Sequence, residues 1–304
     1  MDKTDVILSM MLLLNSRASY RELADKLGLS VNAVHKRIQS MVDEGIIRSF
    51  TTRISLITVG GAMVWVLGQG DFVSVEDVKA KLQNNRNVYW LAVTGGDNLL
   101  VGLNMRQASE LDANLRQVIK ACGMKSPFVG ITLFPSMVGD VEKEISPLDF
   151  RIVKALANDS RRTVVQVAEE LSLSAKTVRR RLERMESKGL LEYSISWYPD
   201  ESNDIITLFQ VFLSDDADKH KVGRSLQSRN TPEVLFYHTF DNIPNQIFVI
   251  TWSPTTKELK SLRERLAAES GVARLVPNII YSGYIFPTWR EQMIEEGAAR
   301  TVPG

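Results

Sequence analysis

The sequence predicts an α+β fold made of two tandem copies of one unit, in which three helices precede a mixed domain of strands and helices. Residues 5–45 align without a gap to residues 149–189, with 12 identities in 41 positions. Apolar residues in that segment recur at helical spacing, and the residues after it form short alternating runs separated by turn residues. Because chance explains such agreement poorly, we interpret the chain as an internal duplication.

The composition is that of an ordinary globular protein, with 304 residues, 44% hydrophobic, 24% charged and a net charge of +1. The single cysteine, Cys122, excludes an internal disulfide framework. With only three histidines, all far apart in sequence, we expect no metal site, and we expect no cofactor. No apolar run approaches the roughly 20 residues that span a bilayer, and the first five residues are not a positive leader. We therefore expect a cytoplasmic protein that binds no membrane.

Three helices open each copy. In the first copy one helix spans residues 5–14, and a second begins at Ser19, which has capping-box spacing to Glu22. Ser30 caps a third helix that runs to about residue 44, and its apolar residues form one buried stripe. The stripes of the two copies are Val34, Ile38 and Met41, and Val178, Leu182 and Met185. Gly45 ends the helix, and residues 46–57 alternate like a β-hairpin, which completes the winged helix-turn-helix order.

The mixed domain of each copy has the order strand, helix, strand, strand, helix, strand, which is ferredoxin-like. In the first copy the strands are expected at 62–67, 88–93, 99–103 and 128–134, and the helices at 75–82 and 111–121. In the second they are expected at 205–212, 234–239, 247–251 and 278–286, and at 219–226 and 256–268. The predicted domains are winged helices at 1–58 and 146–200, ferredoxin-like domains at 59–137 and 201–290, and a polar tail at 291–304 with little power to bury itself.

The third helix of each copy is typical of a DNA recognition helix, because long donors lie opposite the apolar stripe. Residues 30–41 carry two basic residues and no acid, 2 − 0 = +2, while residues 174–185 carry five against Glu183, 5 − 1 = +4. The residues expected to contact DNA are Ser30, Asn32, Ala33, His35, Lys36 and Arg37 in the first copy, and Ser174, Lys176, Thr177, Arg179, Arg180, Arg181 and Arg184 in the second.

Within these sets, residues near the helix N-terminus are expected to meet base edges, and later basic residues to meet phosphates. The base readers are then Asn32, Ala33 and Lys36, and Lys176, Thr177 and Arg180. Arg180 and Arg184, four residues apart, are expected to share a face. Arg48 and Arg53 of the first wing are expected to reach the DNA backbone, whereas Glu192 at the Arg48 position makes the second wing a weaker candidate.

The segments 23–30 with 34–38, and 167–174 with 178–182, resemble the leucine-responsive/asparagine-type (Lrp/AsnC) transcription regulators. The resemblance covers essentially the whole chain, twice over. It implies a regulator that binds duplex DNA, forms homo-oligomers and senses a small molecule, often an amino acid, through the α/β domain. The effector residues that it implies are Thr94, Gly95, Asp97 and Asn98. The alternative is that Gly95-Gly96 only makes a tight turn. The second copy has a longer, glycine-free segment, 240–245, which weakens the case for a site there.

Two other functions share these features. Sirohaem decarboxylases have the same plan of winged helix and ferredoxin-like domain, with histidines near the second strand of the α/β domain, and residues 232–248 are loosely similar to that region. His238 lies off the expected position, however, and Ala92 takes that place in the first copy, so we expect His238 to be an ordinary sheet residue. A winged helix can also be a protein-interaction module, but the basic, acid-poor helix faces argue against it. We therefore predict a sequence-specific DNA-binding regulator with two reading heads, and not an enzyme.

The assembly follows from the apolar, aromatic-rich strands at 62–67 and 205–212, because each needs a partner surface. We expect the two α/β domains to pack together within one chain, as a covalent pseudo-dimer.

Overall fold

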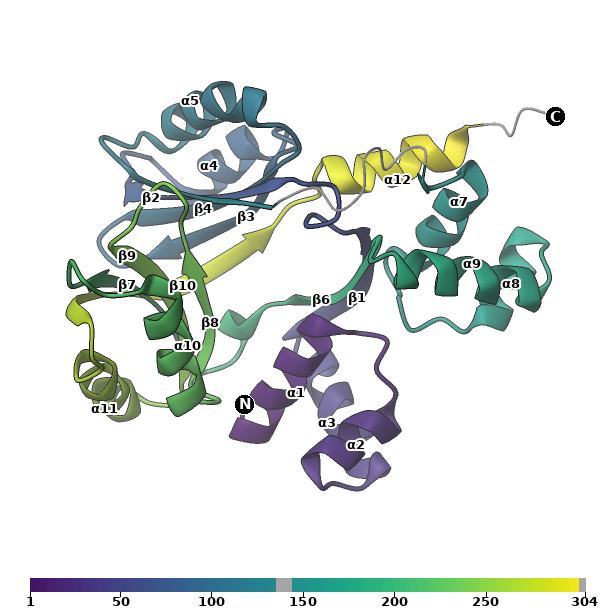
Figure 1. The fold of residues 1–304 in the computed structure, drawn as a ribbon, viewed down its shortest axis with the longest axis horizontal. Helices are drawn as coiled ribbons and strands as arrows, with labels where there is room; N and C mark the ends of the chain where they lie inside the picture. Colours follow the sequence, from purple (N-terminus) through teal and green to yellow (C-terminus); the bar gives the residue numbers. More distant parts are fainter. Residues whose placement is uncertain (135–143, 301–304) are drawn as a thin grey trace.

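The computed structural model describes residues 1–134 and 144–300. In Figure 1 the two copies share one central body and carry separate three-helix heads. The first head consists of α1 (Lys3–Leu14), α2 (Tyr20–Leu27) and α3 (Val31–Asp43), and the second of α7 (Pro147–Leu156), α8 (Val164–Leu171) and α9 (Ala175–Ser187). The predicted caps are confirmed, because Ser19, Ser30 and Ser174 each accept a hydrogen bond from a backbone N–H three residues on.

The body contains the two ferredoxin-like halves, as predicted. The first half is β2 (Ala62–Gln69), α4 (Val75–Leu82), β3 (Val88–Thr94), β4 (Asn98–Met105), α5 (Leu111–Cys122) and β5 (Phe128–Leu133). The second is β7 (Ile205–Leu213), α10 (Lys219–Arg229), β8 (Val234–Thr239), β9 (Gln246–Ser253), α11 (Thr256–Ala267) and β10 (Val272–Ile285). Short 3-10 turns lie at Ala108–Glu110 and Pro199–Glu201. The strands form one sheet in the order β5-β2-β4-β3-β10-β7-β9-β8, so the halves join where β3 pairs with β10.

β10 begins six residues before the predicted start at residue 278. Its first part pairs with β7 and its last part with β3, so one long strand serves both halves. Pro277 is unfavourable inside a strand, because proline has no N–H to donate. Here it pairs with β7 on one side only, since the pairing with β3 starts at Ile280, and such an edge position tolerates proline.

The predicted intrachain pairing of the two α/β domains is confirmed. One face of each half is covered by its own helices, and the other faces meet in a shared core. The ring of Phe128, on β5, lies 4.7 Å from that of Phe248 and 5.2 Å from that of Phe240, which come from the second half. Trp65 and Leu208, from the strands expected to need a partner, are both buried there. Figure 1 shows α4 and α5 on one outer face and α10 and α11 on the other.

The segment 240–245 closes the body on the side opposite the β3–β10 pair. Asn242 accepts a hydrogen bond from the backbone N–H of Ile131 through Oδ1 (2.8 Å) and donates one to the carbonyl of Val129 through Nδ2 (2.9 Å). The carboxylate of Asp241 accepts from the backbone N–H of Leu133 (2.7 Å). Side chains thus pair with the free edge of β5 in place of a further strand.

The residues after each head form a strand pair that the sequence did not predict. β1 (Ile47–Ile54) pairs antiparallel with β6 (Leu191–Trp197), its counterpart in the other copy, so the expected hairpin at residues 46–57 is wrong. Alternation is the same for a hairpin arm and for a strand with a distant partner. The missing signal was a turn, since residues 46–57 contain no Gly, Pro, Asn or Asp.

The two heads meet around a pseudo-twofold axis beside this strand pair. Ser16 and Ser160, identical in the repeat, are both buried, and their hydroxyls form a 2.6 Å hydrogen bond. Arg161 donates to the carbonyl of Ser16 (2.9 Å), and Arg17 donates to the carbonyl of Ser160. Residues that are identical in the two copies therefore contact each other, and these contacts fix one head against the other.

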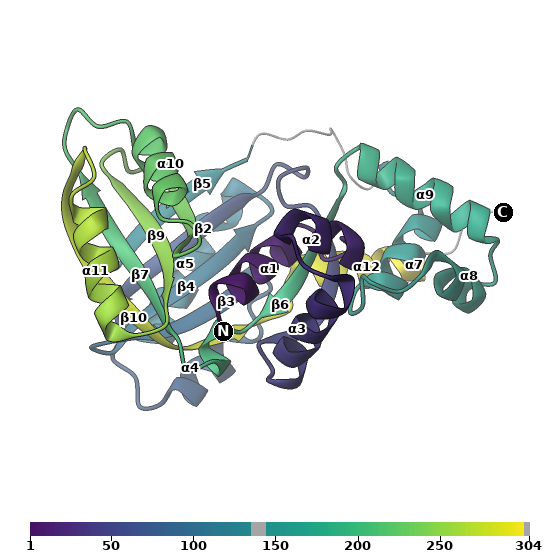
Figure 2. The same ribbon diagram turned by 90° about the horizontal axis from the view of Figure 1, so that it is seen from below.

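The expected polar tail at 291–304 is wrong as far as residue 300. Residues Trp289–Ala299 form α12, which packs on α7 and buries Met293 and Ile294 in the core of the second head. Figures 1 and 2 both show α12 reaching from the body to that head. Residues 289, 293 and 297 recur every four positions and make a contact stripe, which the surrounding charged residues obscure in the sequence. The end of the first α/β domain, predicted at residue 137, and part of the linker after it lie outside the described residues.

Gly297 allows α12 to approach α7, because a Cβ atom there would lie 2.4 Å from the ring of Phe150. We expect Gly297→Ala to lower the thermal unfolding temperature, since overpacking costs about 1–3 kcal/mol and exceeds the gain of roughly 1 kcal/mol in helix propensity. Differential scanning calorimetry measures this shift. Adding Phe150→Leu should restore much of the loss, and a Gly297→Ala protein more stable than wild type would contradict the close contact.

Candidate nucleic-acid interface

The recognition helices α3 and α9 bury the predicted stripes. Val34, Ile38 and Met41 are at most 2% exposed, and their counterparts in α9 are at most 4% exposed. Gly45 and Gly189 follow with left-handed backbone, φ 78° and 63°, which stops each helix before its strand. One side of each helix is therefore fixed in the head and the other is free to meet a partner.

The outer side carries six of the predicted residues as exposed side chains: Asn32, His35, Lys36, Lys176, Arg179 and Arg180. Across residues 1–134 and 144–300 no ion pair engages the basic residues among them. The imidazole of His35 lies edge-to-face against Tyr20, 5.1 Å between ring centroids. Ala33 and Thr177 are half-buried. The structure thus exposes four of the six predicted base readers, Asn32 and Lys36 on α3 and Lys176 and Arg180 on α9.

Ser30 and Ser174 are exposed at the N-termini of these helices and act as caps. Ser30 Oγ accepts from the N–H of Ala33, and Ser174 Oγ from the N–H of Thr177, both at 3.1 Å. Thr177 Oγ1 also lies 2.8 Å from Ser174 Oγ. The remaining backbone N–H groups and the positive end of each helix dipole favour an anion at this position, such as a DNA phosphate.

Three predicted DNA contacts are instead paired inside the heads. Arg37 donates to Asp5 (2.7 Å) and to Asp2 (2.8 Å) at the start of α1. In the second head Arg181 (2.9 Å) and Arg184 (2.7 Å) both bind the fully buried carboxylate of Asp149. Arg184 therefore turns to the same carboxylate as Arg181, and the expectation that it shares a face with Arg180 is wrong. Because repeat-equivalent residues form the Arg37–Asp5 and Arg181–Asp149 pairs, we assign these pairs to holding the recognition helix against the first helix.

The Asp149 carboxylate is held ionised by its surroundings. Burial raises the pKa of Asp149, but hydrogen bonds from Ser146 and Arg181 and the charge of Arg184 outweigh it and leave the pKa below its ordinary value. The charge of Asp149 is thus part of the folded head at neutral pH.

The wing arginines have partners in the other copy. Arg48 pairs with Glu201 and stacks on the ring of Tyr198, 3.7 Å from the centroid. Arg53 pairs with Glu291 of α12 at 2.6 Å. The expectation that Arg53 reaches the DNA backbone is wrong in this arrangement, because its side chain is paired with α12 and only 23% exposed. Arg48 is 50% exposed, and its contact with DNA stays a prediction.

The predicted effector residues form a tight hairpin between β3 and β4. Thr94 is 1% exposed and its hydroxyl donates to the carbonyl of Asn98 (3.2 Å), while Asn98 Nδ2 donates to the carbonyl of Gly95 (2.8 Å). Gly96 and Asp97 are both left-handed, φ 70° and 57°, as in a type I′ turn. The hairpin brings the four residues together, and three of them, Thr94, Gly95 and Asn98, take part in hydrogen bonds within it.

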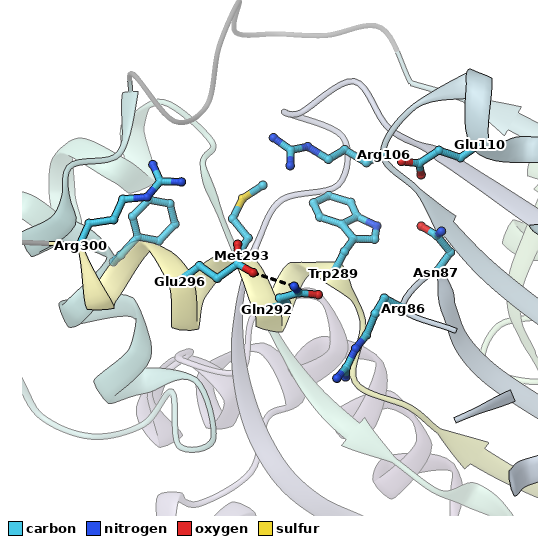
Figure 3. A pocket seen from close by; sticks show the side chains of 10 residues that line it. Arg86, Asn87, Arg106, Glu110, Trp289, Gln292, Met293, Glu296 and Arg300 are labelled. Carbon is cyan, nitrogen blue, oxygen red and sulfur yellow. Dashed lines mark hydrogen bonds between the residues drawn. The ribbon is translucent and has the colours of Figure 1, made fainter. Parts of the chain in front are cut away.

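Sequence reasoning missed two cavities that depend on α12. One, of about 250 Å³, lies between the first α/β half and the second head and is shown in Figure 3. Arg86, Arg106, Trp289 and Met293 line it, and Gln292 donates to Glu296 at 2.6 Å along its floor. The other, of about 210 Å³, lies between the β1–β6 pair, the body and the start of α12. No local motif marks either one, because each wall comes from a different part of the chain.

His238 lies on β8 with its ring 4.9 Å from that of Trp65, between the two halves of the body. Burial lowers the pKa of His238 to about 4, so the imidazole is neutral at physiological pH.

Within the described residues no three His, Cys, Asp or Glu side chains are grouped as metal ligands. No helix in that part of the chain is long and apolar enough to cross a membrane.

Known proteins match this chain at the heads and over the whole fold. A family model described as winged helix-turn-helix DNA-binding matches residues 1–48 and 145–192. The HTH-type transcriptional regulator LrpA of Pyrococcus horikoshii is 30% identical over 103 residues, 34% of this chain and 73% of that protein. An uncharacterised HTH-type transcriptional regulator of the same organism is 27% identical over 156 residues, 50% of this chain and 97% of that protein. The crystal structure of the siroheme decarboxylase NirDL has a TM-score of 0.59 at 17% identity and covers 97% of both chains, which shows a shared fold.

The buried carboxylate of Asp149 gives a stability test. We expect Asp149→Asn to lower the free energy of unfolding by about 2–3 kcal/mol at pH 7, less than for fully buried pairs because Arg181 and Arg184 reach solvent. Since the folded pKa lies below the usual 3.8, this stabilisation is present above about pH 4 and is lost as the pH falls through the folded value. Chemical denaturation at pH 7 and at pH 3 measures the change.

The matched control is Asp5→Asn in the first head, which should cost less because Asp5 is 18% exposed against 0% for Asp149. A loss from Asp149→Asn that is the same at both pH values would show that the carboxylate charge does not stabilise the head.

Proposed function

Because the chain belongs to the leucine-responsive/asparagine-type (Lrp/AsnC) transcription regulators, we propose that it binds duplex DNA sequence-specifically through two heads, with α3 and α9 as recognition helices. The observation that carries this proposal is the exposed basic face on both helices. Lys36 on α3, and Lys176 and Arg180 on α9, have no ion-pair partner among the described residues, so their charge is available for phosphates and base edges.

The two heads are proposed to bind with unequal strength. Once the arginines paired to Asp5 and Asp149 are set aside, α3 keeps Lys36 alone, 1 − 0 = +1, on residues 30–41. On residues 174–185, α9 keeps Lys176, Arg179 and Arg180 against Glu183, 3 − 1 = +2. The second head should therefore supply more of the salt-dependent affinity, and the two half-sites should differ in sequence because different side chains meet them.

The regulator is favoured over an enzyme of the same fold by the relatives. Both regulators from Pyrococcus horikoshii are more similar in sequence to this chain than the decarboxylase is, whose likeness is one of fold. Trp65, Phe128 and Phe248 lie in the core that the two halves of the body share. Phe128 packs against Phe248 and Trp65 packs against His238, so the neutral imidazole is explained as part of that core. We propose that the α/β halves serve assembly and sensing, and that the chain catalyses no reaction.

Arg180 tests the base-reading role. We expect Arg180→Ala to weaken binding to the preferred duplex by about 1–3 kcal/mol and to relax base preference at its position, if the guanidinium binds guanine in a bidentate way. Lys36→Ala should cost less, because an ammonium makes a point contact. Fluorescence anisotropy with a labelled duplex at several salt concentrations measures both, and each lost phosphate contact lowers the salt slope by roughly 0.9.

Glu183→Gln is the control for this experiment, because it lies on the same helix and its removal should not weaken binding. Equal losses from Arg180→Ala and Lys36→Ala, with the same salt slope, would show that the heads are equivalent.

The hairpin at residues 94–98 tests the effector proposal. A Cβ atom at Gly95 would lie 3.3 Å from the hydroxyl of Tyr281, so a β-branched side chain must displace that ring. We expect Gly95→Val to weaken binding of an amino-acid effector by tenfold or more, about 1.4 kcal/mol, and to leave basal DNA binding intact. Calorimetry with the common amino acids measures this. An unchanged affinity in Gly95→Val would leave the hairpin as a turn and nothing more.

A further inference from the structure

The smaller cavity lies where the strands that carry the heads cross the body. Its volume is about 210 Å³. Arg53 on β1 and Glu192 on β6 are directly opposite each other in the strand pair and line one wall. Tyr89 on β3 and Asn104 on β4 line it from the body, and Arg290 lines it from α12. Each wall therefore belongs to a separate part of the fold.

Two polar side chains in this cavity have no hydrogen-bond partner among the described residues. Asn104 is 6% exposed, yet its side-chain amide neither donates to nor accepts from any described group. The hydroxyl of Tyr89, a half-buried residue, likewise has no hydrogen-bond partner among the described residues. Unpaired polar groups that line a cavity favour an occupant that can bond to them, as water or a polar ligand can.

Two arginines and two glutamates line the cavity, and the arginines keep N–H donors that these carboxylates do not use. Arg53 uses Nε for Glu291 (2.6 Å), and Arg290 uses Nε for the carbonyl of Ile54 and one terminal nitrogen for Glu192, both at 2.7 Å. Within the described residues, the terminal nitrogens of Arg53 and the second one of Arg290 donate no hydrogen bond. The two carboxylates of the cavity, those of Glu291 and Glu192, are the partners of these arginines. Guanidinium, hydroxyl and amide donors together match a carboxylate.

The rest of the wall is apolar. It consists of Leu56, Ile57, Met63, Phe134, Ile285 and Phe286. A cavity of roughly 150 Å³ is enough to hold benzene, so the volume here leaves room for a ring or short aliphatic chain together with a carboxylate.

We propose that this cavity binds a small carboxylic acid with an aromatic or branched aliphatic body, its carboxylate facing Arg53, Tyr89 and Asn104. The bound acid joins the head-carrying strand pair to the body and α12, and so biases the position of the heads on DNA. The effect on DNA binding rests on the proposed function, whereas binding of the acid in the cavity does not. The site is separate from the hairpin at residues 94–98, none of whose residues line this cavity.

Benzoate and its neutral isostere benzamide test the site in the full chain by isothermal titration calorimetry. We expect benzoate to bind and benzamide to bind at least tenfold more weakly, because the donors then meet no charge. Tyr89→Phe and Asn104→Leu should each weaken benzoate binding about tenfold or more without lowering the unfolding temperature, since each removes a polar group that has no partner in the protein. Tyr281→Phe, on an exposed tyrosine, is the matched control and should bind as wild type does.

Absence of benzoate binding at millimolar concentration, or equal binding of benzamide, would overturn the site and leave water as the partner of Tyr89 and Asn104. Loss of binding in Gly95→Val with none in Tyr89→Phe would place the acid at the hairpin instead.

Fluorescence anisotropy with a labelled duplex then tests the regulatory part of the proposal. A benzoate-dependent shift in DNA affinity that disappears in Tyr89→Phe supports it. An unchanged DNA affinity overturns the regulatory part alone. If the chain binds no DNA, the proposed function fails, while calorimetry still decides the site.

Discussion

The arrangement of the whole molecule depends on the antiparallel pairing of β1 with β6. Phe50 lies opposite Ile195 and Thr51 opposite Ser194, positions that the duplication relates to each other, so the pseudo-twofold axis passes between them. The Ser16–Ser160 hydrogen bond lies beside the same axis. Each strand runs directly from a recognition helix into a half of the body. The register of the β1–β6 pair therefore sets the separation and orientation of the two heads. Two copies folded as independent units would leave this geometry undefined.

Duplication preserved the interior of the heads and let their outer faces diverge. The Asp5–Arg37 and Asp149–Arg181 pairs are equivalent, as are the buried stripes of α3 and α9. The exposed positions differ, with Lys36 in the first head where the second has Arg180. Interior positions are held by packing and by paired charge, whereas an exposed position is constrained only by what it touches. Selection can therefore act on the exposed face of each head separately.

Local signals made much of the fold predictable. Capping residues, four-residue apolar spacing and alternating strands depend on neighbours in sequence. The structure has the helices and strands that they predicted within a few residues of the expected bounds, except at the start of β10. Partners far apart in sequence were not predictable in the same way. Nothing near Arg53 indicates Glu291, and nothing near Asp149 shows that it binds two arginines of α9. Helical periodicity was enough to predict that Asn32, Lys36, Lys176 and Arg180 are exposed, whereas the positions of Arg184 and Arg53 depend on tertiary contacts.

The two heads are anchored by the same helix face in different ways. Val6 on α1 packs into the shared core of the body, and Lys3 beside it pairs with Glu233 at 3.1 Å. Phe150, the equivalent of Val6, packs instead against Gly297 of α12. The second head thus contacts the body through an extra helix whose first turn carries Arg290 and Glu291, the partners of Glu192 and Arg53. Because these ion pairs connect α12 to the strand pair, a change in them alters the support of the second head more directly than that of the first. Asymmetry between the heads then lies in their attachment as well as in their side chains.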